Sequence, residues 1–255
     1  MSRSVKAVGR VDQPGEERCQ DWDSYLAALG ARYSAGRGDR KQERSKRREQ
    51  EILGAALRVF ARDGISRARI GDIASEAGMP VSSLYDYFPS KEDLAYGLPL
   101  EHLARFFAEY AEACSELRTC RERLRLYLWL SADFARRNQH WARALYLEIW
   151  PSVFVAETPV RGALDDYVRV IIRLLKAGVD AGEWPAEPNP YITASILIGS
   201  LNQVIIVWLL YRAPRDLMKA VASVCDRTMS LLGTGTDPRT RKGARQGTRE
   251  RALDR

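Results

Sequence analysis

From residue 47 to residue 232, apolar side chains recur three and four positions apart, and no useful stretch alternates apolar with polar residues. The first spacing is that of amphipathic helices, and the alternation that is missing is that of strands. Breaks at Pro151, Pro159, Gly182–Pro190 and Pro214 divide the pattern into segments of helix length. The sequence therefore predicts an all-α protein.

The spacing predicts three short helices followed by six longer ones. The short helices are expected from about residue 47 to Gly64, over 69–77 and over 80–88. The longer ones are expected over 91–116, 120–138, 140–150, 159–181, 190–212 and 214–232, and Pro99 is expected to kink or split the first of them. Ser90 and Asp93 have the capping-box spacing that opens that helix. We expect a small N-terminal unit over 47–94 and a larger bundle over 95–232.

The second and third short helices are joined by only a few residues around Gly78, which is typical of a helix-turn-helix. In that motif the leading end of the second helix enters the major groove of DNA. Val81, Ser82 and Ser83 stand at that end, where hydroxyls and free backbone N–H groups can donate to phosphates or base edges. Lys91 opposes the dipole of its own helix, an arrangement that a bound phosphate would explain.

The positive charge of the chain is concentrated in its flanks. The net charge is +7, and the run Arg37–Arg48 alone holds seven basic and two acidic residues. We expect residues 1–46 to form a mostly disordered basic arm, in which WDSYLAALGARY has the spacing of a short loose helix, and residues 233–255 to form a disordered basic tail. The charge of these two flanks is equally consistent with arms that contact DNA and with disordered ends that are only solvated.

Cysteine and histidine usage argues against a metal centre. The four cysteines show no CxxC spacing, only two histidines are present, and the N-terminus does not read as a signal peptide. We expect free thiols in a reducing cytoplasm, with no metal and no cofactor. Neither a nucleophile motif, a phosphate loop nor a catalytic triad is apparent, so we expect no catalytic residues and no enzyme activity.

One segment is long and apolar enough to cross a membrane. No charged residue lies between Glu187 and Arg212. Asn202 and Gln203 stand side by side at its centre, and amphipathic helices surround it in the sequence. We therefore expect a helix buried in a bundle and no association with a membrane.

The runs ILGAALRVFARDG and IGDIASEAGMPVSSLYDYFPSKEDL resemble the DNA-binding domain of TetR-family transcriptional regulators, over residues 47–94. Residues 95–232 resemble the ligand-binding and dimerisation domain of that family in architecture only. The resemblance implies a homodimer that binds a near-palindromic operator in double-stranded DNA and is most simply a repressor released by a small apolar or aromatic effector. The alternative is a non-enzymatic architectural DNA binder without effector control.

The resemblance also implies roles for individual residues. Ser83, Tyr85 and Lys91 would contact phosphates, Val81 and Ser82 would approach base edges, and Tyr87 would lie against the DNA backbone or pack inside the domain.

The chain departs from the family pattern at several positions near this surface, including Gly71, which lacks a side chain that often reads a base. Arg69 stands where a serine or threonine commonly caps a helix, and is expected to reach a phosphate instead. Pro80 replaces the usual capping serine, so that cap bond is lost. Asp86 either accepts from a cytosine amino group or points to solvent, and solvent is the expectation.

Two further sets of residues are predicted in the larger bundle. The effector site is expected among aromatic and polar side chains in a setting with few charges: Phe106, Trp129, Tyr146, Trp150, Tyr167 and Asn202. The dimer interface is expected from apolar residues of the last two helices: Ile198, Leu201, Ile205, Trp208, Leu209, Leu217, Val221 and Val224.

Overall fold

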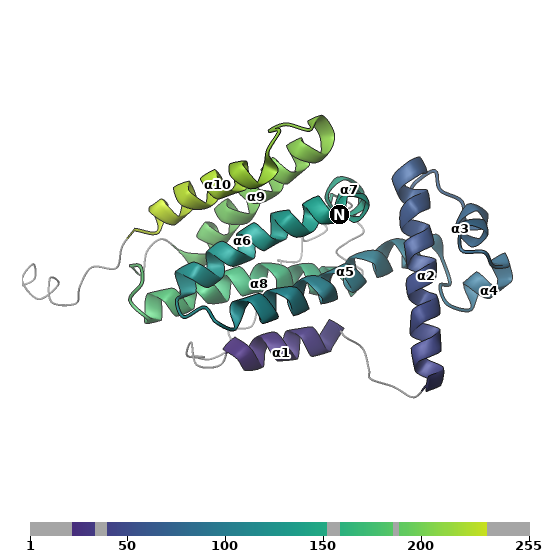
Figure 1. Cartoon of the computed structure of the whole chain (residues 1–255), viewed down its shortest axis with the longest axis horizontal. Helices are drawn as coiled ribbons and strands as arrows, with labels where there is room; N and C mark the ends of the chain where they lie inside the picture. The colour runs from purple at the N-terminus through teal and green to yellow at the C-terminus, as the bar shows by residue number, and fades with distance from the viewer. Residues whose placement is uncertain (1–21, 34–39, 152–158, 186–188, 234–255) are drawn as a thin grey trace, which may run out of the picture.

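The computed structural model describes residues 22–33, 40–151, 159–185 and 189–233. Within these ranges the regular structure is helical and no strand is present, which confirms the all-α prediction (Figure 1). The first part of the predicted arm and nearly all of the predicted tail lie outside the described residues.

A small unit is formed by α2 (Arg40–Asp63), α3 (Ile70–Glu76) and α4 (Val81–Tyr85), which lie together at one end of the molecule (Figure 1). Gly64 after α2 and Gly78 between α3 and α4 have positive φ values of 80° and 61°, a region that glycine adopts without steric cost. The unit has its own buried core, which includes Ile52, Val59, Phe60, Ile73, Leu84, Leu94 and Leu98.

The predicted disordered arm is wrong for two of its segments. α2 begins at Arg40, so most of the basic run is the first two turns of a long helix. Residues Trp22–Tyr33 form α1, which packs along α5 (Figure 1). Trp22, Leu26 and Leu29 of α1 are 7%, 2% and 2% exposed, so this helix is part of the protein core.

Two charged contacts hold α1 to α8 (Pro159–Asp180) as well. Arg32 Nη1 lies 2.6 Å from Oδ2 of Asp166, whose side chain is only 3% exposed. The guanidinium of Arg173 lies 3.8 Å from the centre of the Tyr25 ring, within the range of a cation–π contact. The sequence spacing indicated the helix but not its docking.

The helix α5 (Lys91–Cys114) joins the small unit to the bundle. Ser90 caps it, since its side chain accepts a hydrogen bond from the backbone N–H of Asp93 at 3.0 Å. Pro99 lies inside the helix and does not split it, contrary to one of the two expectations.

The bundle consists of α5, α6 (Cys120–Arg137), α7 (Gln139–Arg143), α8, α9 (Pro190–Tyr211) and α10 (Leu217–Leu231), with the π-helix η2 (Ala144–Ile149) after α7. α6 packs on α8 and α10, and α9 packs on α8 and α10. Thr119 and Glu122 form a reciprocal capping box at the start of α6. The expected single helix over 140–150 is instead a short α-helix that widens into a π-helix.

Candidate nucleic-acid interface and ligand cavity

The short helix α4 presents a small polar and aromatic face to solvent. Leu84 is fully buried and anchors it to the small core, whereas Val81 and Tyr85 are 38% and 48% exposed. Ser82 is exposed and Ser83 half-buried on the same helix. With α3 behind it, α4 has the exposed leading end that a major groove can accept.

The helices α3 and α4 both begin without a side-chain capping bond, as the sequence predicted. Pro80 precedes α4 with φ −63° and ψ 146°, and it makes no side-chain cap bond. Arg69 precedes α3, also without a side-chain cap bond, and is exposed. Asp86 is exposed at the end of α4, and Tyr87 is half-buried against the small core, which is the packing alternative for that residue.

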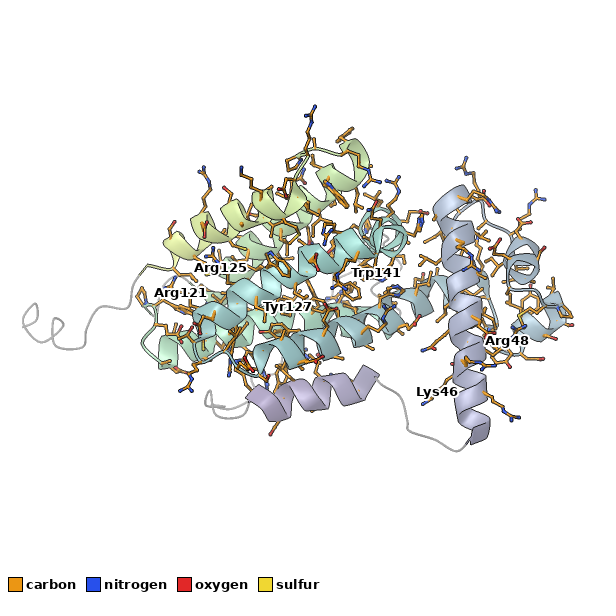
Figure 2. All side chains as sticks on the ribbon, in the orientation of Figure 1. Lys46, Arg48, Arg121, Arg125, Tyr127 and Trp141 are labelled. Atoms are coloured by element: carbon orange, nitrogen blue, oxygen red, sulfur yellow. The ribbon has the colours of Figure 1, made fainter. Side chains whose placement is uncertain are left out.

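Lys91 is the first residue of α5 and has a defined position. Its Nζ donates to the backbone carbonyl of Ser66 at 3.1 Å, which ties the first turn of α5 to the loop between α2 and α3. Basic side chains continue along the N-terminal half of α2, where Figure 2 labels Lys46 and Arg48. Arg48 is paired with Glu51 at 2.8 Å. Basic side chains therefore lie on α2 and at the first turn of α5, the helices that flank α3 and α4 in the chain.

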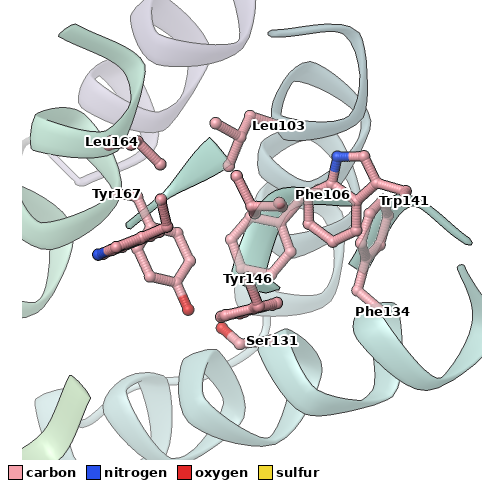
Figure 3. Close-up of a pocket in the computed structure, with 10 residues that line it drawn as sticks. Leu103, Phe106, Ser131, Phe134, Trp141, Tyr146, Leu164 and Tyr167 are labelled. Carbon is pink, nitrogen blue, oxygen red and sulfur yellow. The ribbon is translucent and has the colours of Figure 1, made fainter. Parts of the chain in front are cut away.

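A small cavity lies inside the bundle between α5, α6, α7, η2 and α8. It is closed in this structure, with room for little more than a water molecule between the side chains. Aromatic and aliphatic groups form most of its wall, and three of the lining residues carry a hydroxyl group: Ser131, Tyr146 and Tyr167 (Figure 3). The ten lining residues are Leu103, Phe106, Ser131, Phe134, Trp141, Leu145, Tyr146, Trp150, Leu164 and Tyr167.

Four of the six predicted effector residues line this cavity: Phe106, Tyr146, Trp150 and Tyr167. Trp129 does not, because it faces outward on α6 and is 41% exposed. Asn202 does not line it either, although its side-chain oxygen is buried without a hydrogen-bond partner. Sequence reasoning missed the other six lining residues: Leu103, Ser131, Phe134, Trp141, Leu145 and Leu164. Of these, Ser131 had a signal in the sequence, since it lies four residues after Tyr127 on the same helix.

The predicted dimer residues are mostly on the wrong face of their helices. Seven of them are 0–8% exposed inside a single protomer: Ile198, Leu201, Ile205, Trp208, Leu209, Leu217 and Val221. Val224 is half-buried. Exposed apolar side chains of α9 occupy another face, with Ile192, Ile196 and Leu210 at 60%, 48% and 47% exposed. The correction follows from packing, since α8, α10 and α6 already cover the predicted residues.

α9 is the helix of the described ranges that is long and apolar enough to cross a membrane, and 44% of its apolar window is buried within the protein. It runs through the bundle beside α8 and α10. Its burial is that of a core helix with one uncovered side.

The π-helix η2 touches both the cavity and the small unit. The backbone N–H of Trp150 bonds to the carbonyl of Leu145 at 2.8 Å, the five-residue step of a π-helix. Leu145 and Tyr146 line the cavity, while Glu148 points to the small unit, where its Oε2 accepts from the backbone N–H of Ile65 at 2.7 Å. One turn of helix therefore carries contacts to both regions.

An exposed helix-turn-helix on a small helical unit, attached to a helical bundle with an internal cavity, defines the class of DNA-binding regulators of transcription. Residues 52–96 match the family described as bacterial regulatory proteins, tetR family. The match covers most of the small unit and the first turn of α5, so this part of the chain is similar to the DNA-binding domain of that family.

Similar proteins share this arrangement over nearly their whole length. The chain is 24% identical over 190 residues to the fatty acid metabolism regulator protein of Bacillus subtilis, covering 74% of this chain and 97% of that protein. It is 24% identical over 201 residues to the transcriptional regulator TtgR of Pseudomonas putida, covering 76% of this chain and 95% of that protein.

A solved structure has the same fold. The transcriptional regulator FadR from Bacillus subtilis in complex with stearoyl-CoA superposes with a TM-score of 0.66 at 23% identity, over 74% of this chain and 99% of that one. About a quarter of this chain therefore has no counterpart there.

His102 behind the cavity wall generates a pH prediction. Its ring stacks on Trp141 at 5.3 Å between centroids, and its Nδ1 lies 3.1 Å from the carbonyl of Leu98. Burial, with a smaller contribution from Arg105, lowers the pKa of His102 from 6.5 to about 4. The folded protein holds this ring neutral while the unfolded chain takes up a proton below its own pKa, so this residue costs stability as pH falls.

The free energy of unfolding of the wild type should fall between pH 7 and pH 5, and we expect His102→Gln to make this fall smaller by about 2 kcal/mol. The measurement is urea unfolding at each pH. The exposed His140 provides the control, as His140→Gln should leave the slope unchanged. Equal slopes for wild type and His102→Gln would show that the ring is not held neutral.

Proposed function

We propose that the chain is a homodimeric repressor of the bacterial cytoplasm that binds a near-palindromic DNA operator and is released by a small apolar or aromatic effector. The observation that carries the proposal is the path of α5. Its first turn carries Lys91, whose Nζ contacts the loop between α2 and α3, and further along Leu103 and Phe106 line the cavity. A molecule that parts the cavity walls thus acts on the helix that positions the DNA-binding unit.

The exposed end of α4 supports the proposed DNA contacts. Val81 and Ser82 approach base edges, and Ser83, Tyr85 and Lys91 contact phosphates. Hydroxyls, a lysine and backbone N–H groups at a helix start are the usual donors to phosphate oxygens. Arg69 adds a phosphate contact from the start of α3, and Tyr87 supports the unit from inside.

The uncovered face of α9 supports a dimer. Ile192, Ile196, Gly199, Gln203 and Leu210 follow one another at helical spacing along that face. A Cβ on Gly199 would meet nothing within 4 Å, so a second helix can approach the backbone closely at this point. An exposed apolar stripe of this length is costly in water, and a second copy related by twofold symmetry would cover both stripes.

A twofold dimer fixes the form of the operator. Two α4 helices related by the symmetry axis meet two half-sites that read alike on opposite strands, about 34 Å apart or a multiple of that. The stearoyl-CoA in the Bacillus subtilis complex shows that a relative of this fold takes a ligand with a long apolar chain. That precedent and the aromatic cavity wall support an apolar effector for this chain.

Release requires the effector to bind the DNA-free arrangement better than the DNA-bound one. The contact between Glu148 and Ile65 offers a second route beside α5, because η2 lines the cavity on one side and holds the end of α2 on the other. Opening the cavity displaces Tyr146 and with it the turn that carries Glu148.

Lys91→Ala tests the DNA-binding face. Loss of one phosphate contact should weaken binding to all duplexes and lower the slope of log K against log salt by about 1. The measurement is a fluorescence anisotropy titration over a range of salt concentrations. Arg118→Ala removes the same charge at the far end of the bundle and should leave the slope unaltered. An unaltered slope for Lys91→Ala would remove this residue from the interface.

Glu148→Ala tests the second link between the domains. Without this acceptor the small unit is held less firmly, and we expect DNA affinity to fall about 5- to 10-fold, with faster hydrogen exchange at the Ile65 amide. Glu148→Gln keeps an acceptor oxygen and should stay near wild type in both measurements. Faster exchange at Ile65 with wild-type DNA affinity would mean that this contact does not set the position of the DNA-binding unit.

A further inference from the structure

We propose that the cavity selects a neutral ring compound carrying a hydrogen-bond-accepting oxygen, and that the hydroxyl of Tyr167 donates to that oxygen. The inference rests on the proposed function, because it names the chemical class of the effector. It specifies that the effector is uncharged, that it carries an acceptor oxygen and that Tyr167 recognises this oxygen. An apolar cavity alone specifies none of these properties.

The cavity wall excludes charged molecules. None of its ten lining residues is Asp, Glu, Lys, Arg or His. A carboxylate or ammonium group transferred into such a site would lose its hydration with no opposite charge to replace it, a cost of several kcal/mol. The guest that fits best is therefore uncharged. The space between the side chains holds little more than a water molecule in this structure, so a ring compound enters only when the cavity walls part.

Tyr167 brings an unused donor into this apolar space. The residue is 5% exposed, and its hydroxyl oxygen is buried without a hydrogen-bond partner. Figure 3 shows the hydroxyl directed toward the side of the cavity where Ser131 lies. A buried polar group without a partner is uncommon in folded proteins, and a ligand is one of the partners that explains it.

The neighbours of the hydroxyl do not satisfy it. Ser131 Oγ donates its proton to the carbonyl of Tyr127 at 2.7 Å and could still accept through its lone pairs, but the Tyr167 hydroxyl makes no hydrogen bond with it. Ser131 and Tyr146 are near enough to lower the pKa of Tyr167, but burial outweighs them and raises it to about 12. Tyr167 is thus protonated at neutral pH and acts as a donor. Neither neighbour meets hydrogen-bond geometry with it.

Trp141 supplies a second unused donor in the same wall. It is 4% exposed, and its Nε1 is buried without a partner. An indole N–H donates and never accepts. Figure 3 draws this N–H on the side away from the Tyr167 hydroxyl, so Tyr167 is the donor that calls for an acceptor on the guest, such as a ketone or ester oxygen, and a hydrocarbon would leave it unsatisfied.

Three naphthalenes of nearly equal shape test this selection: 2-acetylnaphthalene with a carbonyl oxygen, 2-isopropylnaphthalene with a methyl in its place, and the anion 2-naphthoate. Dissociation constants come from the rise of Tm with ligand concentration, in the absence of DNA. We expect the full-length wild-type chain to bind the ketone about fivefold more tightly than the hydrocarbon, the yield of one hydrogen bond, and to bind the anion least.

Tyr167→Phe should abolish the preference for the ketone and leave hydrocarbon binding as it was. Tyr110→Phe is the matched control, since it removes a buried tyrosine hydroxyl that donates to the carbonyl of Arg123 at 3.1 Å, outside the cavity lining. It should lower Tm and keep the preference. Tyr167→Phe should not lower Tm, because its hydroxyl has no partner to lose.

The proposal is overturned if none of the three compounds binds, if the wild type shows no preference, or if Tyr167→Phe retains it. It is also overturned if Tyr167→Phe lowers Tm as much as Tyr110→Phe, which would reveal an internal partner. Ketone binding that depends on Tyr167 but does not release DNA would uphold the selection and contradict the proposed effector control.

Discussion

The structure depends on α5 being one uninterrupted helix with buried residues in two cores. Leu94 and Leu98 pack in the small core, and Leu103 and Phe106 pack in the bundle, slightly more than one turn further along. Each end is therefore fixed to a different unit by the burial of apolar side chains, worth about 1.5–3 kcal/mol for each large one. A helix held in this way transmits a shift at one end to the other, because neither core can slide along it without losing packing.

Contacts around α5 limit how the two units can move. At Gly97 an added Cβ would come within 3.1 Å of Leu53 on α2, so the two helices meet closely there. The Glu148 contact holds the other end of α2 to the bundle. α1 packs along α5 in the bundle and is followed in the chain by α2 of the small unit. The small unit is consequently held by packing of α2 against α5 and α7, by one hydrogen bond from η2 and by covalent connection to α1.

Much of the small unit could be predicted from the sequence, because its signals are local. Gly64 and Gly78 mark positive φ angles, Ser90 caps α5, and Leu84 alternates with polar neighbours on a short helix. The dimer face could not be predicted in this way, because α9 is apolar on nearly every side. The spacing of its apolar residues therefore does not distinguish the buried face of the helix from the exposed face. Ile198 and Ile196 look alike in the sequence, and only packing buries the first and exposes the second.

The residues that line the cavity could also be predicted only in part from the sequence. Phe106, Tyr146, Trp150 and Tyr167 were predictable as aromatic residues in helices with few charges, but Trp129 met the same criteria and faces solvent. Glu148 had no sequence signal, since its role depends on a π-helix and on a partner 83 residues away. The docking of α1 likewise depends on Asp166 and Arg173, far along the chain.

The most direct test of the account is selection of duplexes bound by the full-length chain from a random DNA pool. The account predicts enrichment of two half-sites related by twofold symmetry, centred about 34 Å apart or a multiple of that, with one dimer bound to each duplex. Binding without enrichment of any sequence, with a steep dependence on salt, would contradict it and indicate a DNA binder that reads only the backbone.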